Sequence, residues 1–116
     1  MSNVTIYGIK NCDTMKKAMA WLDERGVQYR FHDFRKDGLE AKQLDLWLKE
    51  LGWETLLNRR GQLWRKVADD VRENIDAASA RELMLDNPGI IKRPVLDVNR
   101  HRHVGFDPEK YAKLFA

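Results

Sequence analysis

A single cysteine, Cys12, lies in the segment GIKNCDT at positions 8–14. The segment is polar and begins with glycine, which is typical of an exposed turn, and a helical pattern follows it directly. A cysteine at a helix N-terminus faces free backbone N–H groups and the positive end of the helix dipole, so its thiolate is stabilised. Lys10 adds a nearby cation. We therefore predict a reactive thiol at Cys12; the alternative is a small buried hydrophobic residue.

Three other residues of this turn, Lys10, Asn11 and Thr14, are predicted to contact a substrate at Cys12. The Lys10 ammonium group would hold an anion. Thr14 and its neighbour Asp13 have two possible roles, because residues of the first helical turn either tune a neighbouring thiol or cap the helix. The sequence leaves both roles open.

The pair Arg93-Pro94 precedes a run of strand-forming residues, Val95–Val98. Proline lacks a backbone N–H, so it belongs at the first residue of a strand or at a sheet edge. A cis bond before Pro94 would aim the preceding backbone outward, whereas the local sequence alone favours the trans bond.

One cysteine cannot form an internal disulfide, and this fits a reducing compartment. A disulfide reaction at Cys12 therefore needs a second thiol from outside the chain. No apolar run approaches the roughly 18 residues of a membrane span, and the chain starts without a signal-peptide pattern. We expect a cytoplasmic protein with no membrane contact.

The formal net charge of +3 is a small excess of basic over acidic residues. The two kinds alternate along most of the chain, which is typical of solvated helix surface, so nucleic acid is not a predicted partner. His101 and His103 lack nearby carboxylate or thiol ligands in the sequence, and we predict no metal site. The four tryptophans lie in helical segments, where core packing is the expected role.

A strand, a turn and a helix would position Cys12. Residues Val4–Tyr7 are β-branched and aromatic and predict a short buried strand. Thr14–Arg25 has helical spacing, and Gly26 marks its end. Apolar and polar residues alternate along Val27–Asp33, which predicts a second strand and hence a βαβ unit.

The middle of the chain, from about 36 to 87, is predicted to be a helical insertion. Asp37–Glu40 has the Asp-x-x-Glu form of a capping box, and the apolar spacing after it indicates a helix. Trp53–Leu57 predicts a short helix and Ala77–Asp86 a longer one, which ends at Asn87-Pro88-Gly89.

The last third of the chain is predicted to form a hairpin and a helix. Val95–Val98 is the third strand, Asn99–Arg102 the turn and Val104–Phe106 the hairpin partner. Asp107 followed by Pro108 marks the start of the last helix. The order β-α-β, insertion, β-β-α favours an α/β fold with a four-stranded mixed sheet. The length of 116 residues predicts a single domain over 1–116, and we expect a monomer.

Four segments at similar spacing resemble the ArsC/Spx family, most closely its YffB-type branch. They are the GIKNCDT turn, Leu57–Gly61, Trp64–Lys66 and Lys92–Val95. The resemblance implies a thioredoxin-like fold with a helical insertion between strands 2 and 3. It also implies a nucleophilic Cys12 and a cis-proline, Pro94, that faces it. Arg60 and Arg93 would line the pocket, with Arg59 as the alternative to Arg60.

The sequence departs from the family's arsenate reductases and from its redox switches. Gly8 stands where arsenate reductases have a histidine four residues before the cysteine. Their third pocket arginine has no counterpart around Val104–Phe106, since Arg100 and Arg102 are displaced. Met15 occupies the second position of the Cys-x-x-Cys found in many Spx proteins. An oxyanion needs convergent cations, so arsenate reduction ranks second.

These features favour a glutathione-dependent monothiol reductase. The Cys12 thiolate would form a mixed disulfide with glutathione or an oxidised substrate, and external glutathione, the cosubstrate, would resolve it. Lys10, Arg60 and Arg93 would hold the glutathione carboxylates. The alternatives are a glutaredoxin-coupled arsenate reductase and an Spx-like regulator that binds RNA polymerase.

Overall fold

The structure, a computed structural model, describes residues 3–116, and its contacts divide them into two compact units. One unit comprises the chain up to Asp37 together with Arg93–Ala116, and we call it the sheet unit. The other, Gly38–Lys92, is the helical unit. Its limits lie close to those predicted for the helical insertion, about 36 to 87. The single domain over 1–116 stays a prediction.

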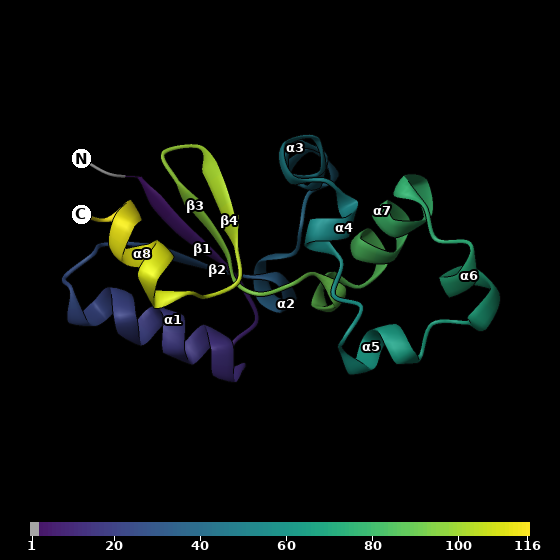
Figure 1. Cartoon of the computed structure of the whole chain (residues 1–116), viewed down its shortest axis with the longest axis horizontal. Helices are drawn as coiled ribbons and strands as arrows, with labels where there is room; N and C mark the ends of the chain where they lie inside the picture. Colours follow the sequence, from purple (N-terminus) through teal and green to yellow (C-terminus); the bar gives the residue numbers. More distant parts are fainter. Residues whose placement is uncertain (1–2) are drawn as a thin grey trace. The chain divides into compact units, whose positions relative to one another are not determined.

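The sheet unit contains a four-stranded mixed sheet (Figure 1). Its strands are β1 (Val4–Gly8), β2 (Arg30–Asp33), β3 (Val95–Val98) and β4 (His101–Val104). Their order across the sheet is β2-β1-β3-β4; β1 pairs parallel with β2 and antiparallel with β3, which pairs antiparallel with β4. The predicted sheet and the helical insertion between strands 2 and 3 are confirmed.

Helices α1 (Asp13–Glu24) and α8 (Pro108–Leu114) bury one face of this sheet. Period-two alternation along β1 places Val4 and Ile6 on that face, because successive strand residues point to opposite sides. Trp21 of α1 meets the ring of Tyr111 edge-on, with ring centroids 5.5 Å apart. The shared apolar core consists of Val4, Ile6, Met15, Ala18, Trp21, Leu22, Leu96, Val98 and Tyr111.

Two strand predictions need correction. The second strand begins at Arg30, not Val27, because only residues from Arg30 onward pair with β1. The hairpin partner of β3 is His101–Val104, not Val104–Phe106. Asn99 and Arg100 both have positive φ, 51° and 70°, so they form a two-residue turn and the return strand starts sooner than predicted.

The helical unit has buried apolar residues of its own. The elements are α3 (Ala41–Leu51), α4 (Trp53–Leu56), α5 (Gln62–Arg65), α6 (Asp69–Glu73), α7 (Ala77–Asp86) and the 3-10 helix η1 (Pro88–Ile90). The buried apolar residues are Leu44, Trp47, Leu56, Leu57, Ala80, Met84, Ile90 and Ile91. The helices predicted at Trp53–Leu57 and Ala77–Asp86 are confirmed, whereas α5 and α6 were not predicted. Their single turns are too short for an apolar period to show in the sequence.

The predicted capping box at Asp37–Glu40 is wrong. Helix α3 begins at Ala41, and Glu40 precedes it without a side-chain capping bond. Asp37 instead ends the short helix α2 (Phe34–Asp37), and its carboxylate accepts a hydrogen bond from the Asp33 N–H at 3.1 Å. Gly38 then takes a φ of 73°, a left-handed conformation that separates the two helices. At the last helix the predicted cap is confirmed, since Asp107 accepts from the Glu109 N–H at 3.0 Å.

Candidate functional site

Cys12 is the N-cap residue of α1. Its backbone is extended, with φ −96° and ψ 131°, and its carbonyl accepts the first helical hydrogen bond, from the Lys16 N–H at 2.9 Å. Asn11 reverses the chain before it with a φ of 71°, a left-handed conformation that asparagine tolerates better than most residues. The turn from β1 into α1 therefore leaves the Cys12 thiol half-buried at the helix N-terminus.

Several donors surround this thiol. Partial burial by itself raises the pKa of Cys12, but three other influences outweigh it and the net pKa is lowered. They are the backbone N–H of Met15, the Arg93 guanidinium, which acts both as a hydrogen-bond donor and as a positive charge, and the backbone N–H of Thr14. Each favours the charged form of sulfur. The arrangement can therefore hold Cys12 as a thiolate nucleophile.

Arg93 reaches Cys12 from the segment before β3. Its bond to Pro94 is cis, as the family resemblance implied and against the expectation from local sequence alone. Pro94 is buried, and its carbonyl accepts a hydrogen bond from the Gly105 N–H at 2.9 Å, which ties the segment to the end of β4. β3 runs antiparallel to β1, with Val95 opposite Tyr7. The residues that precede β3 and those that follow β1 therefore lie at the same end of the sheet.

Gly8, which stands where the arsenate reductase pattern has a histidine, packs closely against Met15. Gly8 is buried, and a Cβ atom placed on it would lie 2.8 Å from Met15 Cε and still closer to Met15 Sδ. Met15 is itself fully buried. An imidazole at position 8 therefore requires Met15 to move. Nothing local in the sequence signals this contact, because its partners belong to a strand and a helix.

The other predicted residues of the turn are placed less specifically. Lys10 and Asn11 are exposed, and their contact with a substrate stays a prediction. Thr14 contributes to the thiol through its backbone N–H. The N-cap residue of α1 is Cys12, which makes no side-chain capping bond. The Thr14 contribution comes from its backbone, so the role of the Thr14 side chain stays a prediction.

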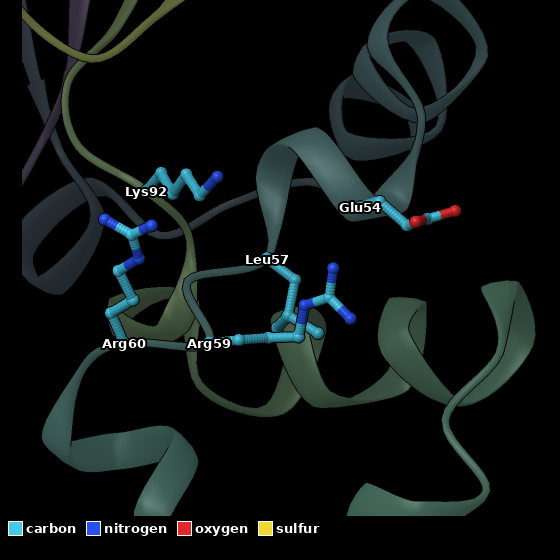
Figure 2. Close-up of a pocket in the computed structure, with 5 residues that line it drawn as sticks. All are labelled: Glu54, Leu57, Arg59, Arg60 and Lys92. Carbon is cyan, nitrogen blue, oxygen red and sulfur yellow. The ribbon is translucent and has the colours of Figure 1, made fainter.

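Arg60 belongs to the helical unit, where it lines a pocket with a volume of about 390 Å³. Figure 2 shows the five lining residues: Glu54, Leu57, Arg59, Arg60 and Lys92. Both arginines considered in the sequence are present, so the choice between Arg59 and Arg60 remains open. Sequence reasoning missed Glu54 and Lys92 as lining residues. The position of Lys92 beside Arg93-Pro94 was the only local signal.

Within residues 3–116, no group of three or more His, Cys, Asp or Glu residues could hold a metal ion. In the stretch His101–His103, Arg102 instead donates to the Asp97 carboxylate at 3.2 Å. Likewise, over residues 3–116 no helix has the length and apolar character needed to cross a membrane.

The sheet order, the cis-proline and the cysteine at the first helix define a thioredoxin-like protein with one candidate reactive thiol. The chain belongs to the ArsC family, whose model matches residues 7–114.

Two similar solved structures resemble almost the whole chain. The YFFB (PA3664) protein is 47% identical, with a TM-score of 0.94, and the match covers 98% of this chain and 100% of that one. An arsenate reductase (ArsC) related protein from Brucella melitensis is 57% identical, with a TM-score of 0.81, over 97% of this chain and 94% of that one. These matches show that the ArsC-family fold extends over both units.

Sequence relatives fall into two kinds. An uncharacterised protein from Haemophilus influenzae is 37% identical over 113 residues, which is 97% of this chain and 99% of the relative. The global transcriptional regulator Spx of Streptococcus agalactiae is 28% identical over 109 residues, which is 92% of this chain and 79% of the regulator. The proteins similar to this chain therefore include a named transcriptional regulator as well as a protein described as related to arsenate reductase.

Proposed function

We propose that this protein is a glutathione-dependent monothiol reductase. The observation that supports it most directly is the lowered pKa of Cys12, produced by two backbone N–H groups and the Arg93 guanidinium. A thiolate is the reactive form of cysteine in disulfide exchange. Cys12 supplies the nucleophile, and Lys10, Asn11, Thr14, Arg93 and Pro94 form the substrate-binding surface around it. Arg60 is a further predicted ligand for a substrate anion.

The reaction proceeds in two exchanges. The Cys12 thiolate attacks the glutathione sulfur of a disulfide between glutathione and another thiol, and that thiol leaves as its thiolate. A second glutathione thiolate then attacks the glutathione sulfur of the mixed disulfide. This releases oxidised glutathione and regenerates the Cys12 thiolate. The resolving thiol comes from outside, because Cys12 is the chain's only cysteine. Glutaredoxin is the other candidate for this resolving role.

Arsenate reduction remains the second enzymatic candidate. Some relatives are described as related to arsenate reductase, and the Arg93 guanidinium at Cys12 is the kind of group that binds an oxyanion. Gly8 counts against it, because the position that carries a histidine in the arsenate reductase pattern has no side chain here. Glutathione is the better match to a site whose cations are few.

Intact mass spectrometry after incubation with oxidised glutathione tests the main function. Wild type should gain one glutathione, and reduced glutathione should remove it again. Cys12→Ser should gain none. A coupled assay with a glutathionylated small thiol should then show turnover that also requires Cys12. An unmodified wild-type protein under conditions that modify free cysteine would reject the reductase.

A regulatory role is the second class of function. The match to the Streptococcus agalactiae regulator Spx supports it, since that match spans most of both chains. An Spx-like protein would bind RNA polymerase, and its thiol would be a switch or idle. Titration with the C-terminal domain of the polymerase α-subunit separates the two roles. Saturable binding without thiol turnover would favour the regulator, and turnover without binding the reductase.

A cytoplasmic location and a monomeric state complete the proposal. The location rests on the reducing environment that a free thiol and glutathione require, and the monomeric state is carried over from the sequence-based expectation.

A further inference from the structure

We propose that the pocket of the helical unit binds an amino-acid head group, that is, a carboxylate and an ammonium on one small ligand. The γ-glutamyl end of glutathione and free glutamate both carry this group. The inference deepens the proposed function, on which it rests for the choice of glutathione. It assigns a role to Arg59, Lys92 and Glu54, three residues that take no part in the proposed reaction at Cys12.

Two segments far apart in the sequence build the pocket. Leu57 and Ile91 form an antiparallel bridge, flanked by hydrogen bonds from the Asn58 N–H to the Ile90 carbonyl at 2.9 Å and from the Lys92 N–H to the Leu56 carbonyl at 2.8 Å. The bridge holds Lys92 beside the segment that carries Arg59 and Arg60, as Figure 2 shows. The basic residues are thus anchored by backbone pairing.

The loop after the bridge is also fixed. The Asn58 carboxamide oxygen accepts a hydrogen bond from the Arg60 N–H at 3.0 Å, a local turn typical of asparagine. Gly61 packs against the same side chain, since a Cβ on it would lie 2.9 Å from Asn58 Nδ2. The Arg59 guanidinium carbon lies 5.5 Å from the centre of the Trp53 ring. These contacts limit the positions open to the two arginines.

The pocket has an excess of positive charge among its described lining residues. Among residues 3–116, no carboxylate forms an ion pair with Arg59, Arg60 or Lys92. The three cations share the pocket with a single carboxylate, that of Glu54 at the start of α4. An anion is therefore the complementary ligand, and a carboxylate suits the planar guanidinium donors. Glu54 supplies the acceptor for an ammonium group.

The remaining properties of the pocket fit a small organic molecule. Its volume of about 390 Å³ falls in the lower part of the range for small-molecule sites, about 300–1,000 Å³. Leu57 is the apolar residue of the lining and lies behind the charged side chains. A ligand with a charged head and a short aliphatic chain matches both. Inorganic phosphate would satisfy the cations alone and leave Glu54 without a role.

Calorimetric titration of the full-length Cys12→Ser variant isolates binding from thiol chemistry. The probes are S-methylglutathione, N-acetyl-S-methylglutathione, glutamate and inorganic phosphate. Arg59→Gln and Lys92→Gln should each weaken S-methylglutathione binding about 5-fold or more, as expected for partly screened charged hydrogen bonds. Lys42→Gln is the matched control, because it removes an exposed cation of the same unit outside the pocket and should leave the affinity unchanged.

Glu54→Gln tests the ammonium contact. It should weaken S-methylglutathione and leave the N-acetylated ligand unaffected. If free glutamate binds with the same affinity as S-methylglutathione, the ligand of the pocket is a free amino acid. If glutamate binds more weakly, the ligand is the glutathione peptide. Phosphate binding equal to both, with no effect of Glu54→Gln, would overturn the inference, as would equal losses in Lys42→Gln. The oxidised-glutathione adduct of wild type is measured separately, so failure of the reductase leaves this result intact.

Discussion

Arg93 acts on Cys12 both as a hydrogen-bond donor and as a positive charge. Both influences favour the charged form of the sulfur and so stabilise the thiolate. Backbone N–H groups of Met15 and Thr14 add to this effect without a side chain of their own. The chemistry of the site thus depends on one substitutable side chain and on the helix terminus.

The lowered pKa of Cys12 predicts the pH dependence of its reactivity. An ordinary thiol, with a pKa of about 8.5, loses its thiolate as the pH falls below that value. Because the pKa of Cys12 is lowered, its thiolate should persist to lower pH than the thiolate of an ordinary cysteine, and its alkylation by iodoacetamide should decline at a lower pH than that of glutathione. Rates measured from pH 5 to 9 check this, with free glutathione as the reference. Coincident profiles for Cys12 and glutathione would show an ordinary cysteine.

Arg93→Ala should raise the pKa of Cys12 and slow adduct formation with oxidised glutathione. Both effects follow from the loss of the guanidinium, and we expect a decrease of about 3- to 10-fold in the adduct rate at pH 6. Lys10→Ala should act in the same direction but more weakly, because its exposed ammonium is screened by solvent.

Arg35→Ala is the matched control for these two variants, since Arg35 is an exposed arginine of the same unit. Its rate profile should coincide with that of wild type. Superimposable profiles for wild type and Arg93→Ala would reject the assignment of Arg93 to the site and leave Cys12 itself unaffected.

The strand β1 and the helix α1 are in close contact where Gly8 packs against Met15. The terminal atoms of Met15 occupy the position of a Cβ on residue 8, so a larger residue there requires the Met15 side chain to shift. Met15 is fully buried and stands in the position of the second cysteine of a Cys-x-x-Cys pair. The same methionine side chain therefore links the packing of the two elements with the absence of a second thiol.

Gly8→Ala should destabilise the fold by about 1–3 kcal/mol, the usual cost of overpacking a core. Met15→Ala alone should cost about 2–5 kcal/mol, because it empties a fully buried position. In the double variant the new methyl group occupies part of the vacated space, so its cost should be less than the sum. Urea unfolding of the four proteins measures this, and additive costs would refute the proposed contact.

At the level of elements, the sequence predicted what local patterns encode. The N-cap of α8 at Asp107 and the end of α7 before Asn87 each depend on residues that are adjacent in the sequence. Both were predicted correctly. The start of β2 and the return strand β4 depend on pairing with distant residues and on two positive φ angles at non-glycine positions, so their limits were wrong. The same reason applies to the pocket, whose Lys92 is positioned by the bridge between Leu57 and Ile91.

Only part of the candidate site was predicted, because local sequence patterns do not show contacts between distant residues. Cys12 follows from its place between a strand and a helix, and Arg93-Pro94 from a resemblance, because nothing local indicates the cis bond. The donors from Met15 and Thr14 are backbone groups, which any residue could provide. No pattern of residue types identifies them.

On the scale of the whole molecule, the thiol and its stabilising groups lie entirely within the sheet unit, and the cationic pocket lies entirely within the helical unit. The family match spans both, from residue 7 to 114. Under the two proposals made above, the nucleophile belongs to the sheet unit and the anion site belongs to the helical unit. Substitutions in the two units are expected to separate reactivity from affinity.

Arsenate should be a poor substrate for the complete protein. A reductase for this oxyanion needs convergent cations at the cysteine. Here position 8 is a glycine without a side chain, and Arg102 of β4 donates to the Asp97 carboxylate. Assays coupled to glutathione and glutaredoxin should therefore give arsenate turnover at least about 10-fold below that of a glutathionylated small thiol, with Cys12→Ser as the blank. Comparable rates for the two substrates would reverse the ranking. In that case Arg93 and the helix terminus alone would suffice to bind and activate the oxyanion.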